Sequence, residues 1–183
     1  MDVNIKVTAP EAIQPVVFEK ILGEKPGGGM VANPAFDIPT GTAVGFDNGA
    51  LKPIKAFRLV KAVLVADTEI EIAKGSGIVV GDFIGNGLVA VESTDLDTTN
   101  ATKDVVTVTM GVDIAIGTVL YQAADASADA AVPIYTPSFL TGAPVIAGEG
   151  DQPIRLVNIA NVRKETVNAS TEVLALLPTI NAV

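Results

Sequence analysis

A gapless internal repeat constrains the fold of this chain more than any other feature of its sequence. Residues 70–84 align with residues 106–120 at an offset of 36 positions, and the second half of the pattern recurs at residues 37–44. The shared unit reads Asp or Gly, Ile, two variable residues, Gly, Thr or Asp, one variable residue and an apolar residue. The glycine permits a tight turn or bulge, the Thr or Asp bonds the local backbone, and the apolar residues return to a core. Three irregular copies are too few for a solenoid, so the repeat predicts hairpins within one barrel or sandwich.

Short apolar segments alternate with turn residues along most of the chain. Asn48-Gly49 is a strong hairpin signal, because both residues tolerate a positive φ. Segments spaced by about 8–12 residues with turn chemistry between them are typical of all-β folds. We therefore predict a mainly β protein, a β-barrel or β-sandwich of repeated hairpins with an extended N-terminal arm and one C-terminal helix. The expected strands are residues 41–46, 51–59, 61–65, 69–73, 79–84, 88–92, 105–110, 118–122, 132–135 and 155–158.

The two ends of the chain differ from its middle. Residues 1–8 alternate apolar and polar, which predicts a strand, and Pro26-Gly-Gly-Gly29 reads as a loop or hinge. Near the C-terminus, residues 166–177 carry an apolar face and end at Pro178, which predicts an amphipathic helix capped by Thr166 or Ser170. The expected organisation is an N-terminal arm over 1–36, a candidate anchor to a partner, then a β domain over 37–165 and a helix with an apolar tail over 166–183.

The residues that the chain lacks exclude several classes of chemistry. It contains no His, no Cys and no Trp in 183 residues. Serine or cysteine nucleophiles paired with histidine, His/Cys metal or haem sites, and disulfides are therefore absent. We expect no catalytic residue, no cofactor and no metal site, and we do not expect an enzyme.

Charge is distributed unevenly along the chain. The net charge is −9, and residues 82–151 hold ten acidic residues against one lysine. We expect this acidic middle to face solvent while the ends meet a partner, with a cation or a basic partner as the alternative ligand of the acidic segment. Nucleic acid is not an expected partner, because no basic block is present to release phosphate counterions.

Three local patterns suggest ligand sites, and each has a simpler interpretation. Asp95 and Asp97 offer carboxylates to Ca²⁺, but they lack the EF-hand spacing, and a polar loop is preferred. Glu69 and Glu71 resemble a carboxylate pair, but their alternation on a strand favours a solvated edge. The triple glycine at residues 27–29 lacks the following Gly-Lys-Ser/Thr of a phosphate loop.

The C-terminal segment is the candidate interaction site. Arg163-Lys164 is the only adjacent basic pair, and either a solvated helix entry or docking onto an acidic partner accounts for it. The helix and tail that follow carry more apolar surface than one small β domain readily hides. We therefore expect self-association, as a dimer or a trimer, through this segment. The candidate interface with other copies or with a partner consists of Arg163, Lys164, Val173, Leu174, Leu176, Leu177, Ile180 and Val183.

No signal for secretion or membrane insertion is visible. The N-terminus lacks the basic and apolar regions of a signal peptide, and no uncharged apolar run reaches the ~18 residues of a membrane span. We expect synthesis in the cytoplasm and no membrane partner.

Several stretches together resemble a known family. They are residues 38–45, Pro53-Ile-Lys-Ala56, residues 70–84 and the segment Arg155 to Thr166 with Val173 to Leu177. This set resembles head fibre or head decoration proteins of tailed bacteriophages, notably of the crAss-like type, over roughly residues 37–183. The resemblance implies a structural virion protein on the capsid exterior that binds the major capsid protein, forms oligomers and has no enzymatic activity.

A carbohydrate- or host-surface-binding module on the virion is the alternative. Such a role is compatible with an exposed fibre, although sugar sites usually need stacked aromatic rings. The chain offers six Phe and two Tyr and no Trp, which argues against a dedicated lectin.

Overall fold

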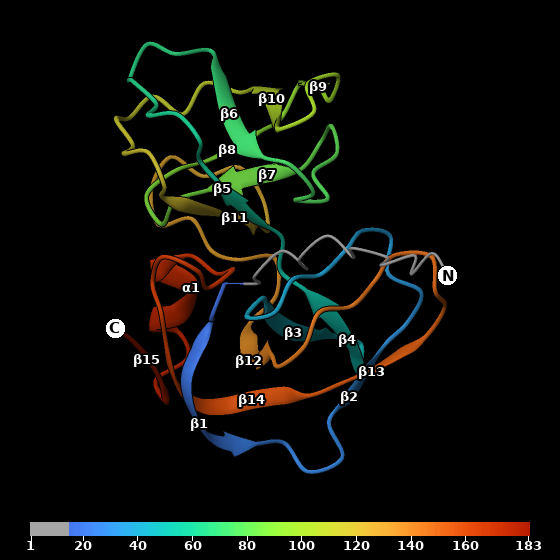
Figure 1. The fold of residues 1–183 in the computed structure, drawn as a ribbon. Coiled ribbons are helices and arrows are strands. Elements are labelled where there is room, and N and C mark those ends of the chain that lie inside the picture. The colour runs from blue at the N-terminus through green and yellow to red at the C-terminus, as the bar shows by residue number, and fades with distance from the viewer. Residues whose placement is uncertain (1–14) are drawn as a thin grey trace, which may run out of the picture.

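The computed structural model describes residues 15–183, and these residues form a mainly β protein with one short C-terminal helix (Figure 1). The predicted fold class is confirmed in this form. The strands pair antiparallel, except for β15, which runs parallel to β14. The elements are β1 (Phe18–Glu24), β2 (Gly29–Val31), β3 (Ala43–Asp47), β4 (Ala50–Pro53), β5 (Ala56–Arg58), β6 (Glu69–Ala73), β7 (Phe83–Gly85), β8 (Ala90–Glu92), β9 (Asp95–Asp97), β10 (Lys103–Thr107), β11 (Val119–Ala123), β12 (Pro137–Thr141), β13 (Gln152–Ile154), β14 (Leu156–Val162), α1 (Thr171–Ala175) and β15 (Ile180–Ala182).

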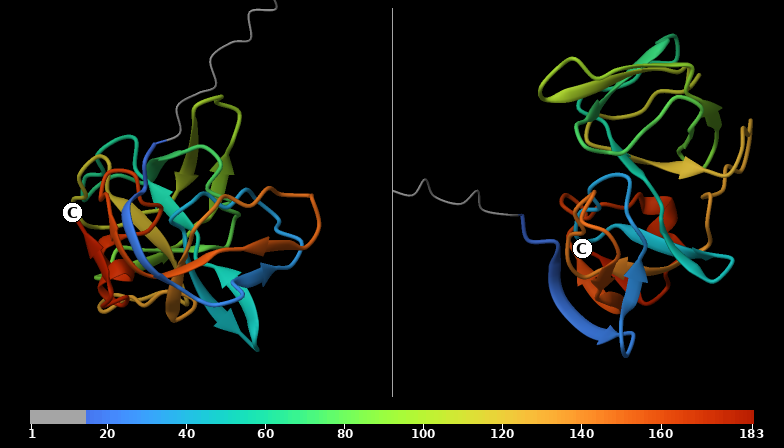
Figure 2. Two further views of the ribbon diagram at one scale, coloured as in Figure 1. Left: turned by 60° about the horizontal axis from the view of Figure 1, so that its bottom comes forward. Right: turned by 90° about the vertical axis from the view of Figure 1, so that its right-hand side faces the viewer.

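The strands gather in two lobes, which Figures 1 and 2 show one above the other. We call the lobe of β5–β11 the distal lobe, and the lobe of β1–β4, β12–β15 and α1 the proximal lobe. The chain leaves the proximal lobe after β4 and returns to it after β11 (Figure 1). The distal lobe is therefore an insertion between two halves of the proximal lobe.

The proximal lobe is built on a sheet of order β1-β14-β12-β3-β4, with β15 alongside β14. Its central strands are buried on both faces, because successive strand residues point to opposite sides. On β3, Ala43 joins one core cluster and Val44 another, and on β14, Val157 and Leu156 divide in the same way. This two-sided burial hides the alternation that would otherwise mark these strands in the sequence.

The part of the expected N-terminal arm that the structure describes belongs to the proximal lobe. β1 pairs with β14, and β2 pairs with β13. The glycine stretch before β2 is a packed turn, since a Cβ on Gly28 would lie 2.4 Å from the Ile154 carbonyl oxygen. The predicted arm over residues 1–36 is therefore wrong for residues 18–31. These residues form strands because they pair with distant parts of the chain, although their local sequence reads as a loop. Residues 1–14, including the strand expected over 1–8, lie outside the described residues.

The repeat builds the distal lobe as two copies that pair with each other. Each copy is a strand, a turn and a second strand: β6 and β7 in the first, β10 and β11 in the second. β6 pairs with β10 so that Ile70 lies opposite Val106, and β7 pairs with β11 so that Gly85 lies opposite Tyr121. Both pairs are separated by 36 residues, the offset of the repeat. The two copies are therefore related by an approximate twofold axis through both pairings.

The repeated apolar positions fill one shared core. Sheets β6-β10-β9 and β5-β11-β7-β8 contribute side chains to the same cluster, which gives a sandwich-like lobe. Four apolar positions of the repeat appear there together with their partners 36 residues on. The pairs are Ile70 with Val106, Ile72 with Val108, Ile78 with Ile114, and Ile84 with Leu120.

The repeated glycine occupies a β-turn in every copy. Gly41, Gly81 and Gly117 all have left-handed φ values, of 79°, 93° and 82°. The residue after each glycine donates its amide to the carbonyl three residues earlier, as in Asp82 N to Val79 O at 3.1 Å. This is the tight turn that the pattern predicts.

Alanine at Gly41 and at Gly117 is expected to destabilise the protein unequally. At Gly117 the only cost is that of an alanine held at a left-handed φ, about 1–2 kcal/mol of stability, because nothing lies within 4 Å of an added Cβ. At Gly41 the new Cβ would lie 2.5 Å from Val17 Cγ1, which adds about 1–3 kcal/mol of overpacking. Urea unfolding of both variants measures the difference, and equal losses would contradict the packing of Val17 on this turn.

The C-terminal helix is shorter than the sequence predicts. α1 begins after Ser170, whose hydroxyl accepts the Val173 amide at 3.2 Å, which confirms one of the two expected caps. Thr166 lies in a preceding turn instead. Its amide donates to the Arg163 carbonyl at 3.2 Å, and its hydroxyl donates to the Val16 carbonyl at 2.6 Å. Hydrogen bonds between this segment and the residues before β1 therefore replace the first turns of the expected helix.

Candidate interaction surfaces

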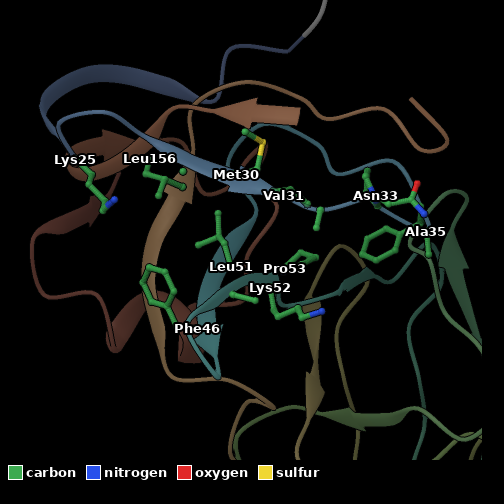
Figure 3. Close-up of a pocket in the computed structure, with 16 residues that line it drawn as sticks. Lys25, Met30, Val31, Asn33, Ala35, Phe46, Leu51, Lys52, Pro53 and Leu156 are labelled. Carbon is green, nitrogen blue, oxygen red and sulfur yellow. The ribbon is translucent and has the colours of Figure 1, made fainter. Parts of the chain in front are cut away.

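A groove of about 560 Å³ lies between β2 and β4 in the proximal lobe (Figure 3). Leu51 and Leu156 are buried beneath it, and a Cβ on Gly29 would meet both side chains, at 3.0 and 2.8 Å. Met30 and Phe46 line the groove and are about half exposed. The groove is therefore lined largely by apolar side chains that remain partly accessible.

Both strands beside the groove have one unpaired edge among the described residues. β4 pairs only with β3, and β2 pairs only with β13. The two-residue turn at Asn48-Gly49 makes Asp47 and Ala50 a hydrogen-bonded pair, so the next pair, Phe46 and Leu51, is not hydrogen-bonded. The Leu51 N–H and C=O therefore point away from β3, at the free edge of the sheet.

The same reasoning applies to Met30 on β2. Its partner is Pro153, which has no N–H, so the ladder bonds fall to Gly29 and Val31 on either side. The Met30 N–H and C=O therefore lie on the outer edge of β2. An extended peptide in this groove finds unpaired backbone groups as well as apolar side chains.

The rim of the groove carries positive charge. Lys25 donates through Nζ to the Gly28 carbonyl oxygen at 2.8 Å, and Lys52 lies on β4. Neither lysine forms an ion pair with a carboxylate within residues 15–183. The groove is therefore suited to an apolar ligand that also brings a carboxylate.

A second surface lies on two neighbouring turns of the distal lobe. Reciprocal backbone bonds between Val63 and Ile114, at 2.9 and 2.8 Å, hold the turns together, and Gly117 donates to the Leu59 carbonyl at 2.9 Å. The side chains at their tips are large, apolar and exposed, up to 66% for Ile116. We call Val60, Leu64, Val65 and Ile116 the turn patch.

Two carboxylates border the turn patch and fix its shape. Asp67 Oδ2 accepts the Leu64 amide at 2.9 Å, and Asp113 Oδ1 accepts the Val65 amide at 2.8 Å. The patch is thus preformed, and its edge is acidic. The sequence interpretation, in which the acidic middle faces solvent, did not anticipate apolar side chains on this lobe.

The structure separates the predicted interface residues into two groups. Val173, Leu174, Leu177 and Ile180 are buried in the proximal core, where they pack beside Val157 and Ala160. They cannot form an oligomer interface in this fold, because the proximal sheet already covers them. Leu176 and Val183 are about half exposed and stay available.

The basic pair at the helix entry is divided in a similar way. Arg163 Nε donates to Glu19 Oε1 at 2.9 Å, which joins β1 to the end of β14. The Lys164 amide donates to the Val183 carbonyl at 3.1 Å, and its ammonium forms no ion pair within the described part of the chain. Only the Lys164 side chain keeps a free charge for a partner.

The candidate carboxylate sites are occupied by contacts within the chain. Asp97 accepts the Thr99 amide at 2.9 Å, and this hydrogen bond lowers the pKa of Asp97. A hydrogen bond from Lys103 lowers the pKa of Glu71 in the same way. Within residues 15–183, no three acidic side chains gather closely enough to hold a metal ion.

Comparisons of the chain with protein-family models, curated proteins and solved structures found no match. Within residues 15–183, the only helix is far too short to cross a membrane.

Neither surface was found from the sequence alone. The signal for the groove was present in Asn48-Gly49, which defines an edge hairpin, but the partner strand β2 lies in a segment that reads locally as a loop.

Proposed function

We propose that this chain is a structural virion protein that decorates the exterior of a tailed-phage capsid, binds the major capsid protein and associates with its own copies. The observation that carries this proposal is the turn patch. Leu64 and Ile116 are 60% and 66% exposed and lie on turns joined by backbone hydrogen bonds. Clustered apolar side chains of this kind mark protein–protein contacts.

The rigidity of the patch favours docking onto a repetitive surface. Its turns are held by the Val63–Ile114 bridge and by two carboxylate caps, so little conformational entropy is lost on binding. Asp67 and Asp113 at its edge favour a partner whose apolar site is ringed by Lys or Arg. In this arrangement the distal lobe meets the capsid, and the proximal lobe is left for contact between copies.

Binding to purified heads tests this function. Full-length chain is mixed with heads that lack it, and bound protein is measured after sedimentation. Leu64→Asp and Ile116→Asp are each expected to weaken binding at least tenfold, because each places a charge in the apolar contact. Leu88→Asp is the matched control, since Leu88 is 65% exposed on another turn of the same lobe.

Circular dichroism is used to check that each variant is folded. Wild-type binding by both patch variants would overturn the role of the turn patch. Immunogold labelling of intact virions tests the location: label at regular positions on heads supports the proposal. Label on tails, or binding to glycans in place of heads, would overturn it in favour of a host-surface-binding module.

A further inference from the structure

The groove between β2 and β4 has the properties of a site for one added β-strand. Its floor is apolar, and the Leu51 N–H and C=O on β4 lack a ladder partner within residues 15–183. A strand added at such an edge gains main-chain hydrogen bonds, while alternate side chains enter the pocket. The occupant must therefore be extended, with apolar side chains at every second position.

One segment of this chain has that pattern and precedes the described residues. Val3, Ile5 and Val7 alternate with Asn4 and Lys6. In an extended strand, the first three side chains point to one face and the other two to the opposite face. Fourteen residues precede Pro15 and span up to ~46 Å when extended, enough to reach a neighbouring molecule.

We infer that residues 3–7 of a second copy of this chain add to β4 as a strand and fill the groove. Val3, Ile5 and Val7 lie against Leu51, Leu156 and Met30, while Asn4 and Lys6 face solvent. Asp2 brings the carboxylate that Lys25 and Lys52 lack. Each copy donates one segment and accepts another, so the exchange closes either as a twofold dimer or as a ring of copies.

Strand exchange also supplies the self-association that the C-terminal segment was expected to provide. Val173, Leu174 and Ile180 are buried in the proximal lobe, whereas no part of residues 15–183 fills the groove. The inference thus rests on the self-association in the proposed function. Its tests use no heads, so its failure and the failure of capsid binding are distinguishable.

Cysteine cross-linking tests the contact directly, because the chain has no cysteine of its own. Two full-length chains of different tag size, one Ile5→Cys and one Met30→Cys, are mixed and mildly oxidised. A disulfide-linked mixed dimer is expected on a non-reducing gel. Asn4→Cys with Met30→Cys is the matched control, since residue 4 points to the opposite face. Ile5→Cys with Val80→Cys controls for random collision, because Val80 is exposed on the distal lobe.

At least fivefold more mixed dimer than in either control supports the inference. Equal yields in all three mixtures would overturn it. The double variant, with Ile5→Cys and Met30→Cys in one chain, distinguishes exchange from folding back. A disulfide confined to monomers would show that the segment fills its own groove, which overturns exchange.

The solution mass gives an independent readout without cysteines. Light scattering on the full chain is expected to give more than one copy per particle, and Met30→Asp is expected to give monomers. Ile146→Asp, at another half-exposed apolar position of the proximal lobe, is the control and should leave the mass unchanged. A wild-type mass for a folded Met30→Asp would contradict the inference.

Discussion

Replacing Asp82 by alanine is expected to lower the free energy of unfolding by about 3–5 kcal/mol, because it leaves a buried ammonium without its counter-charge. Lys55 Nζ lies 2.7 Å from Asp82 Oδ2, and their side chains are only 13% and 8% exposed. Lys55 also stacks over the Phe36 ring, 5.8 Å from its centroid. Urea unfolding followed by circular dichroism gives the free-energy change.

Asp82 has further partners, which raises the expected cost above that of the ion pair alone. Gln122 Nε2 donates to its Oδ1 at 2.8 Å, and the Val79 amide donates to its Oδ2 at 2.9 Å. The double variant Lys55→Met with Asp82→Leu is the control, since it removes both charges and keeps the volume. It should recover the part of the loss that comes from the unpaired Lys55 ammonium, whereas Gln122 and the Val79 amide still lack their acceptor. A loss below about 1 kcal/mol for Asp82→Ala would contradict a dry ion pair at this position.

The ion pair is one of the contacts between the two lobes. Lys55 lies between β4 and β5, where the chain passes from the proximal to the distal lobe, and Phe36 belongs to the proximal lobe. Asp82 lies on a turn of the repeat in the distal lobe. Arg58 adds a second link, through Nη2 to the Val167 carbonyl at 2.8 Å, and burial lowers the pKa of this guanidinium. These polar contacts add to an apolar cluster that spans the junction, in which Tyr121 and Ala123 of β11 lie with proximal-lobe residues such as Val173.

The sequence predicted the elements whose information is local. The strand over 69–73 and the hairpin at Asn48-Gly49 are both confirmed, the latter with φ values of 48° and 82°. The repeat located strands and turns in both copies, but the hairpins predicted from it are wrong, because the two strands of each copy lie in different sheets and pair with the other copy. The confirmed features depend on turn chemistry and on alternation within a few residues, which a single sequence displays.

Most of the elements that the sequence missed depend on distant partners; the exception is β9, which was predicted as a polar loop and pairs with the neighbouring β10. β1, β2, β13 and β15 are short or polar segments that become strands only by pairing with each other or with β14. Conversely, residues 61–65 were expected to form a strand, but only Val63 forms a bridge, and the exposed Leu64 and Val65 belong to a turn. The apolar residues at this exposed turn made it look like a strand in the sequence, and the same residues belong to the turn patch.

The candidate interface was predicted in part for the same reason. The apolar periodicity of Val173, Leu174 and Leu177 identified a buried face correctly, but periodicity does not say which molecule buries it. The groove was missed because Met30 and Leu51 meet only after β2 and β4 have folded onto the same side of the proximal lobe.

Alanine at Ile84 and at Leu120 is expected to destabilise the distal lobe by about 2–5 kcal/mol each, and by amounts that agree within about 1 kcal/mol. The two residues occupy the same position in the two copies of the repeat, and both are fully buried in one cluster. The approximate twofold axis places them on equivalent strands of one sheet, where Leu120 lies opposite Phe57 and Ile84 lies opposite Val91, so both truncations open cavities in the same cluster.

The exposed turn residues of the same two copies provide the control. Val80 and Ile116 are also equivalent in the repeat, but more than half of each is exposed. Alanine at either is expected to change the free energy of unfolding by no more than about 0.5 kcal/mol, because no cavity forms. Urea unfolding of all four variants therefore separates the effect of repeat position on stability from the effect of burial. Very different losses at Ile84 and Leu120, with both variants folded, would mean that the two copies pack differently and that the symmetry ends at the backbone. Equal losses at Ile84 and Leu120 would establish that the repeat determines the core of the distal lobe. Negligible losses at Val80 and Ile116 would establish that the exposed apolar residues at its turns contribute to something other than stability.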